Sequence, residues 1–85
     1  MNKKITIRRD DGKVCFCILS GEKDLQVQLN EMYFHEAYPS GGYAVQLDSD
    51  KLKIIDCIAY DVVTSFDVLS IEDTADLPML DWAFI

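Results

Sequence analysis

No lysine or arginine follows Lys53, and this absence is the most informative feature of the sequence. Residues 1–53 carry eight basic and eight acidic side chains, so their charges cancel, whereas the last 32 residues carry seven acidic ones. The whole net charge of −7 therefore lies in residues 54–85. Binding to duplex nucleic acid requires a basic surface, so this charge balance argues against a protein of that class.

Further absences indicate where the protein works. No apolar run is long enough to cross a bilayer, and the apolar stretch of a signal peptide does not follow Lys3-Lys4. The three cysteines are an odd number and are not spaced like a disulfide framework. We therefore expect a cytoplasmic protein, in the reducing interior of a bacterial or an infected cell.

The sequence does contain enough apolar material for one folded domain. Hydrophobic residues make up 49% of the 85 residues, and four Phe, four Tyr and one Trp supply aromatic rings. Disordered chains lack this much apolar material, although so short a chain must pack it efficiently. Since no repeat, linker or low-complexity tract interrupts the chain, we expect a single small acidic domain over residues 1–85.

The N-terminal residues 3–19 have the pattern of a β-hairpin. Ile5 and Ile7 alternate with polar residues, residues 14–19 are rich in β-formers, and Asp11-Gly12 lies between the two runs. Asp-Gly favours a two-residue type I′ turn, which sets Asp10 opposite Lys13. The pairs predicted for the apolar face are Ile7 with Phe16 and Ile5 with Ile18. The pairs predicted for the reverse face are Arg8 with Cys15 and Thr6 with Cys17.

The middle of the chain mixes strand and helix signals. Aliphatic residues alternate strictly with glutamines over residues 25–29, which predicts a strand, although helical spacing fits nearly as well. Asn30 is the expected N-cap of a short helix over residues 31–37. Pro39 and Gly41-Gly42 must end that helix, and a strand over 43–47 and a turn at 48–50 follow.

Residues 52–63 fit a strand, or a helix capped by Ser49 or Asp50, and their Ile and Val content favours the strand. The remaining elements are a strand over 66–71, an acidic turn or short helix over 72–76, and an edge strand over 82–85. Together these elements predict an α+β fold. It has an antiparallel sheet of about five strands, led by the hairpin of residues 3–19, with one or two short helices.

Four residues are of the kinds that bind zinc: Cys15, Cys17, Cys57 and His35. Zinc-binding cysteine pairs are typically three to five positions apart on turns, whereas Cys15 and Cys17 are two apart on a strand. Cysteine is also a common buried residue, so we expect packed or half-exposed thiols, with no metal and no other cofactor. Because nothing near His35 supplies a nucleophile or an oxyanion loop, we also expect no catalytic residue. A small metal- or thiol-dependent domain built on these four residues is the alternative.

Tyrosines surround the segment Pro39-Ser40-Gly41-Gly42, which has neither the lysine nor the spacing of a phosphate-binding loop. Tyrosine anchors interfaces because its ring is large, rigid and amphipathic. The candidate partner contacts in this region are Tyr33, Tyr38 and Tyr43. The alternative is that these rings cover the sheet.

The second candidate contact region is acidic. Its residues are Asp56, Asp61, Asp67, Glu72, Asp73, Asp76 and Asp81. Clustered carboxylates without counter-cations steer encounters with Lys- and Arg-rich sites, which nucleic-acid enzymes use to hold phosphates. We therefore expect a non-catalytic protein-binding module rather than an enzyme, and specifically an inhibitor that presents this acidic surface to the basic site of a partner protein.

In size and charge, the chain resembles small phage or mobile-element inhibitors of host defence, such as anti-CRISPR and anti-restriction proteins. The resemblance covers the length of 85 residues and the net charge of −7, and no shared motif. It implies inhibition by mimicry of nucleic acid, without direct binding to nucleic acid or to a membrane.

Residues 77–85 are unusually apolar for the end of a chain. Trp82 and Phe84 are large, so we expect this segment to dock as an edge strand of a monomer. The alternative is a homodimer, or a homo-oligomerising accessory domain of a bacterial or phage protein, that shares this edge.

Overall fold

One antiparallel sheet and one helix make up the part of the chain that the structure describes. The computed structural model describes residues 1–36 and 43–85, with the side chains of all of these except residues 33–36 and 43. The elements are β1 (Asn2–Arg8), β2 (Val14–Leu19), α1 (Leu25–Glu36), β3 (Tyr43–Leu47), β4 (Lys51–Asp56), β5 (Val62–Thr74) and β6 (Met79–Phe84). The sheet has six strands in the order β3-β4-β5-β1-β2-β6. This confirms the predicted α+β class with its N-terminal hairpin.

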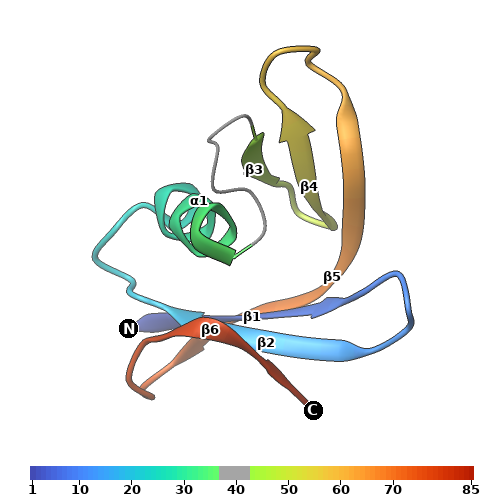
Figure 1. Cartoon of the computed structure of the whole chain (residues 1–85). Helices are drawn as coiled ribbons and strands as arrows, with labels where there is room; N and C mark the ends of the chain where they lie inside the picture. Colours follow the sequence, from blue (N-terminus) through green and yellow to red (C-terminus); the bar gives the residue numbers. More distant parts are fainter. Residues whose placement is uncertain (37–42) are drawn as a thin grey trace.

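The long strand β5 joins two halves of the sheet. Its first half pairs with β4 and its second half with β1, and Asp67 is in register with both neighbours. The two register shifts leave Val63 and Leu69 without a direct partner, and such bulges bend a strand. Figure 1 shows the result: β5 curves, and α1 lies in the angle between β3–β4 and the β1–β2–β6 half.

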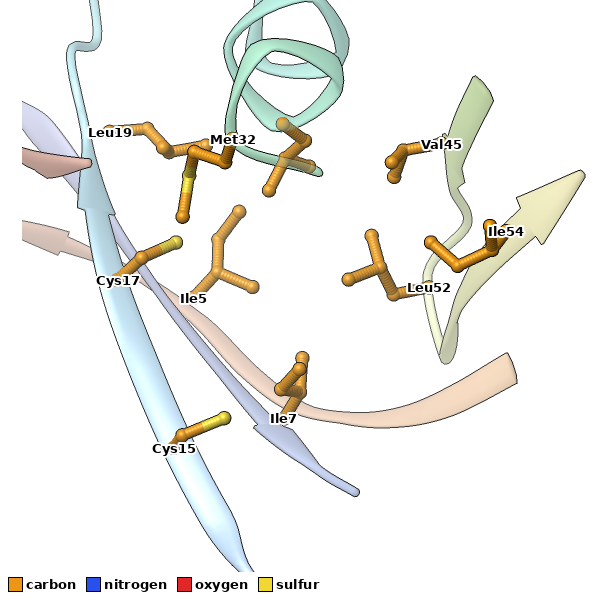
Figure 2. Packing of buried hydrophobic residues seen from close by; sticks show 10 residues of the cluster. Ile5, Ile7, Cys15, Cys17, Leu19, Met32, Val45, Leu52 and Ile54 are labelled. Carbon is orange, nitrogen blue, oxygen red and sulfur yellow. The ribbon is translucent and has the colours of Figure 1, made fainter. Parts of the chain in front are cut away.

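The core fills this angle. Ile5 and Ile7 of β1 and Cys15 and Cys17 of β2 are almost completely buried on the face of the hairpin that α1 covers. Figure 2 shows these side chains pointing toward residues from α1, β3 and β4. The residues contributed by those elements are Leu29, Met32, Val45, Leu52 and Ile54. Burial of this apolar surface is the main stabilising contribution to so small a fold.

The predicted register of the hairpin is wrong by one residue. Ile7 pairs with Cys15 and Ile5 with Cys17, so the two cysteines lie on the buried face rather than on its reverse. Only Gly12 of the two turn residues has a positive φ (80°), whereas a type I′ turn requires it at both. The backbone bonds Arg9 N–H to Lys13 O (2.8 Å) and Gly12 N–H to Arg9 O (2.9 Å) instead close a three-residue loop. Its type I turn, with a left-handed glycine at the end, shifts the pairing.

The predicted strand over residues 25–29 is the first half of α1. Asp24, not Asn30, caps this helix, since its Oδ1 accepts the Val27 N–H at 3.0 Å. The predicted end of the helix at Pro39 lies outside the described residues. Within the described part of the chain, no helix is long and apolar enough to cross a membrane.

The two glutamines that suggested a strand are used for hydrogen bonds. Gln28 is buried, and its side-chain amide accepts the Ser20 N–H and donates to Ser20 O, both at 2.9 Å. Gln26 accepts the Leu47 N–H at 2.7 Å. Their alternation with aliphatic residues therefore reflects the attachment of α1 to β2 and β3, not the two faces of a strand.

The other predictions agree with the structure in large part. The strand over 43–47 is β3, the turn at 48–50 is present, and the edge strand at the C-terminal end is β6. Strand, not helix, is correct for 52–56, but residues 57–59 are a turn. The predicted strand over 66–71 is part of β5, which also includes residues 72–74 of the predicted acidic turn.

The loop geometry predicts the effect of changing Gly12. Gly12→Ala should lower the free energy of unfolding by about 1 kcal/mol, because an L-residue is strained in the left-handed region. A Cβ at this position would meet no atom within 4 Å, so crowding should add nothing. Gly12→Asn is the matched control and should cost less, since asparagine tolerates this conformation. Urea unfolding of the three proteins measures the difference, and equal losses for Ala and Asn would contradict this explanation.

Candidate protein-interaction surface

The turn between β4 and β5 is a projecting hairpin tip, which we define as residues Asp56–Asp61. Asp56 N–H donates to Asp61 O at 2.9 Å, and Tyr60 N–H donates to Asp56 O at 2.7 Å. The Asp56 carboxylate also accepts the N–H groups of Ile58 (2.8 Å) and Ala59 (3.2 Å). These four bonds hold the tip in one conformation, at the end of the sheet remote from the β1–β2 loop (Figure 1).

The side chains of the tip face solvent although two of them are large and apolar. Ile58 is 84% exposed and Tyr60 is 85% exposed. Tyr60 is also the one non-glycine residue with a positive φ (59°) among the described residues. Such a conformation is strained for an aromatic residue and marks sites where backbone shape matters. Beyond the tip, Val62 and Val63 extend the exposed apolar surface along the start of β5.

The seven carboxylates that the sequence singled out are not brought together on one surface. Asp56 and Asp61 lie on the tip, Asp67, Glu72 and Asp73 lie along β5, Asp76 lies in the β5–β6 turn, and Asp81 lies in β6. Two of them are neutralised, because Lys51 forms an ion pair with Asp67 and Lys3 with Asp73. Among the described side chains, Asp61, Glu72, Asp76 and Asp81 form no ion pair.

The fold places the basic first strand beside the acidic fifth strand. Lys3 is in register with Asp73, Lys4 with Glu72, and Arg8 with Asp67. Opposite charges at directly facing positions stabilise a strand pair modestly. The charge separation along the sequence is therefore partly cancelled across the sheet. Among the described side chains, the carboxylates without an ion pair lie on the tip, near the end of β5, in turns and on the outer strand β6.

The ion pairs shift the pKa values of their members. The hydrogen bond and the charge of Lys51 hold the pKa of Asp67 below its usual value of 3.8, and those of Lys3 do the same for Asp73. The pKa of Lys51 is raised in turn, mainly by its hydrogen bond to Asp67. All these groups are at the surface, where salt screens such interactions.

The structure separates the cysteines that were considered as zinc ligands. Cys15 and Cys17 are buried in the core, whereas Cys57 is exposed on the tip. Burial raises the pKa of the Cys17 thiol to about 12 and also raises that of Cys15, so neither is poised as a thiolate. His35 lies on α1, but its side chain is outside the described part. Among the described residues, no group of three or more His, Cys, Asp or Glu is arranged to hold a metal ion.

A small cavity lies beside the buried residues Ile7 and Cys15 of the hairpin. Its volume is about 240 Å³, and the Cys15 thiol forms part of its wall. The other lining residues are Ile7, Arg9, Phe66, Asp81, Trp82 and Phe84. Because the lining is mainly apolar and the pKa of Cys15 is raised, the sulfur serves as a packing group here rather than as a nucleophile.

The tyrosine contacts that the sequence suggested fall on side chains outside the described part. Tyr33 belongs to α1 and Tyr43 to β3, but their side chains are not described, and Tyr38 lies outside the described residues. The tyrosine whose side chain is exposed among the described residues is Tyr60. The sequence predicts it within a continuous strand over residues 52–63. The sequence did contain a sign of this turn. Asp56 and Asp61 flank the four residues 57–60, and aspartates are common at turns.

Comparison with known proteins adds no family: no family model, no curated protein and no solved structure matches the chain.

The burial of the cysteines predicts their reactivity. In the native protein at neutral pH, one thiol per chain (Cys57) should react quickly with a thiol reagent such as Ellman's reagent. All three thiols should react after denaturation. Cys57→Ser should remove the fast reaction, and Cys15→Ser should leave it unchanged. Fast reaction of more than one thiol in the native protein would show that the hairpin core is open.

The ion pairs predict a dependence of stability on pH. A carboxyl whose pKa is lower in the folded than in the unfolded state stabilises the fold above the unfolded value and loses this contribution as the pH falls through the folded value. Asp67→Asn and Asp73→Asn should therefore lower the melting temperature at pH 7 but not well below pH 3.8, where both carboxyls are protonated. Added NaCl at about 1 M should shrink the difference at pH 7. A loss that persists in acid would indicate a packing role instead.

Proposed function

We propose that this protein is a non-catalytic protein-binding module that inhibits its partner by occupying a basic, nucleic-acid-binding site. The observation that carries the proposal is the tip: large apolar side chains stand exposed between Asp56 and Asp61, in a half of the chain without any lysine or arginine. Exposed hydrophobic surface beside carboxylates suits a partner pocket that is apolar inside and bordered by cations.

The apolar side chains and the carboxylates of the tip contribute to binding in different ways. Tyr60 and Ile58 supply the area whose burial gives affinity, and tyrosine is enriched among residues that dominate binding energy. Asp56 and Asp61, which bound the tip, supply the field that steers encounter and selects a basic partner. The fixed backbone of the tip lowers the entropy lost on binding, since the loop is already ordered.

The proposal does not depend on all seven carboxylates. Asp67 and Asp73 already have cationic partners within the chain, so a second cation gains less from them. We assign the contact to the tip, whose own carboxylates are Asp56 and Asp61. Glu72 near the end of β5, Asp76 in the β5–β6 turn and Asp81 in β6 are not part of this surface. The inhibitor role rests on the competition between this surface and phosphate groups for the same cations.

Capture of partners from a bacterial lysate by the immobilised protein tests the proposed function. Captured proteins should elute as NaCl rises from about 50 mM to about 500 mM, because screening weakens contacts between opposite charges. They should also elute with duplex DNA or RNA at low salt, and an enzymatic activity among them should fall when the free protein is added. Capture that resists both salt and nucleic acid would contradict the proposal.

Tyr60→Asn tests the tip against a purely structural role. Asparagine tolerates the left-handed backbone better than tyrosine, so this variant should be at least as stable as the native protein in thermal unfolding. It should nevertheless bind a captured partner about tenfold more weakly or worse, because the exposed ring is lost. The matched control is Val27→Asn, at an exposed apolar position on α1, which should not change binding. Equal affinity of Tyr60→Asn and the native protein would exclude the tip as the anchor.

A further inference from the structure

The cavity beside the N-terminal hairpin has an apolar floor built from neighbouring strands. Ile7 pairs with Cys15 and Cys15 pairs with Phe84, so these three residues form a row on one face of the sheet. Ile7 and Cys15 are almost completely buried, and Figure 2 shows their side chains on the same side of the hairpin. The half-buried residues Phe66 and Trp82 complete the apolar lining. Because burial raises the pKa of the Cys15 thiol, the floor carries no charge at neutral pH.

The rim of this cavity is charged. Arg9 and Asp81 line the cavity together with the apolar residues, and both are exposed to solvent. They carry opposite charges, but neither forms an ion pair with the other or with any other described residue. Asp81 Oδ1 accepts the backbone N–H of Trp82 at 2.9 Å, and an ionised carboxylate has further lone pairs for a second donor. The cavity therefore combines a neutral apolar floor with one cation and one anion at its rim.

Two cations lie over the ring of Phe84, which forms one wall of the cavity. The guanidinium carbon of Arg9 is 5.4 Å from the ring centroid, and Nζ of Lys13 is 5.8 Å from it. Neither cation forms an ion pair with a described carboxylate, and the carboxylate of Asp11 accepts the backbone N–H of Lys13 at 3.0 Å. Two like charges held over one ring repel each other, so a negatively charged ligand group beside them would offset this repulsion.

The size and the lining of the cavity define the ligand that it can hold. Its volume of about 240 Å³ exceeds the roughly 150 Å³ of an apolar cavity that binds benzene, so one aromatic ring with a short chain fits. The rings of Phe66, Trp82 and Phe84 favour an aromatic ligand, because aromatic pairs gain energy beyond the burial of area. A ligand with a carboxylate and an ammonium group would satisfy both Arg9 and Asp81, whereas a ligand with one charge would satisfy only one of them.

We propose that this cavity binds a free aromatic amino acid. The ring of the ligand packs on the apolar floor, its carboxylate accepts hydrogen bonds from Arg9 beside the charge of Lys13, and its ammonium group donates to Asp81. A ligand of this size with two charged contacts should bind with a dissociation constant on the order of 1 mM. The cavity adjoins the base of the β1–β2 loop, remote from the tip (Figure 1), so this inference does not depend on the proposed function.

The fluorescence of Trp82, the single tryptophan, reports on this site in the full chain. L-Phenylalanine should change the fluorescence saturably, with a midpoint on the order of 1 mM. Hydrocinnamate lacks the ammonium group and phenylalaninamide lacks the carboxylate, so each should bind about tenfold more weakly than phenylalanine. Arg9→Gln should weaken the binding of phenylalanine about tenfold but not that of phenylalaninamide. Asp81→Asn should weaken the binding of phenylalanine about tenfold but not that of hydrocinnamate.

Matched substitutions outside the cavity serve as controls. Arg8→Gln and Asp76→Asn remove the same charges at exposed positions that do not line the cavity, and they should bind phenylalanine like the native protein. Tyr60→Asn should also bind it normally, so the tip and the cavity are tested independently. The proposal would be overturned by the absence of a saturable change up to about 10 mM phenylalanine, or by equal affinities of the native protein for phenylalanine and hydrocinnamate. Circular dichroism of each variant confirms that it is folded.

Discussion

The pairing of β1 with β5 is the interaction on which the rest of the fold depends. It joins the hairpin and β6 to β3 and β4, and without it the sheet would consist of two separate parts. It connects residues far apart in the sequence, such as Lys3 and Asp73, and it aligns the basic strand with the acidic one. The bulges in β5 then bend the sheet, which creates the angle that α1 fills.

This pairing also changes the meaning of the charge distribution. Along the sequence, a neutral half precedes an acidic half, and a continuous acidic surface over residues 56–81 would be the simplest consequence. Across the sheet, Lys3, Arg8 and Lys51 lie beside carboxylates of β5 and reduce their field. The remaining charge is concentrated at the periphery, where Asp61 stands on the tip and Asp81 on the outer strand. A surface that binds cations must therefore be sought at the ends of the sheet and not along its centre.

Local sequence patterns predicted most of the strands, and each prediction that failed has a physical reason. The N-terminal hairpin and β3 follow from short-range alternation and turn residues, and β6 follows from the large apolar side chains of Trp82 and Phe84. The register failed because Asp11-Gly12 fits both a two-residue and a three-residue loop, and the backbone of Asp11, which lacks the positive φ that a type I′ turn requires, decides between them. The strand over 25–29 failed because Gln26 and Gln28 make tertiary hydrogen bonds, which no local pattern can reveal. Tyr60 was missed for a different reason: its exposure depends on where a local turn, bounded by Asp56 and Asp61, interrupts an apolar run.

Charge distinguishes the two exposed apolar regions of the protein. The tip bears Asp56 and Asp61 and no cation, so two tips would repel each other. The edge at β6 carries both signs, with Asp81 on the strand and Arg9 and Lys13 over Phe84. In a chain of net charge −7, the cations that the fold places beside Phe84 thus lie at the boundary of a negatively charged molecule.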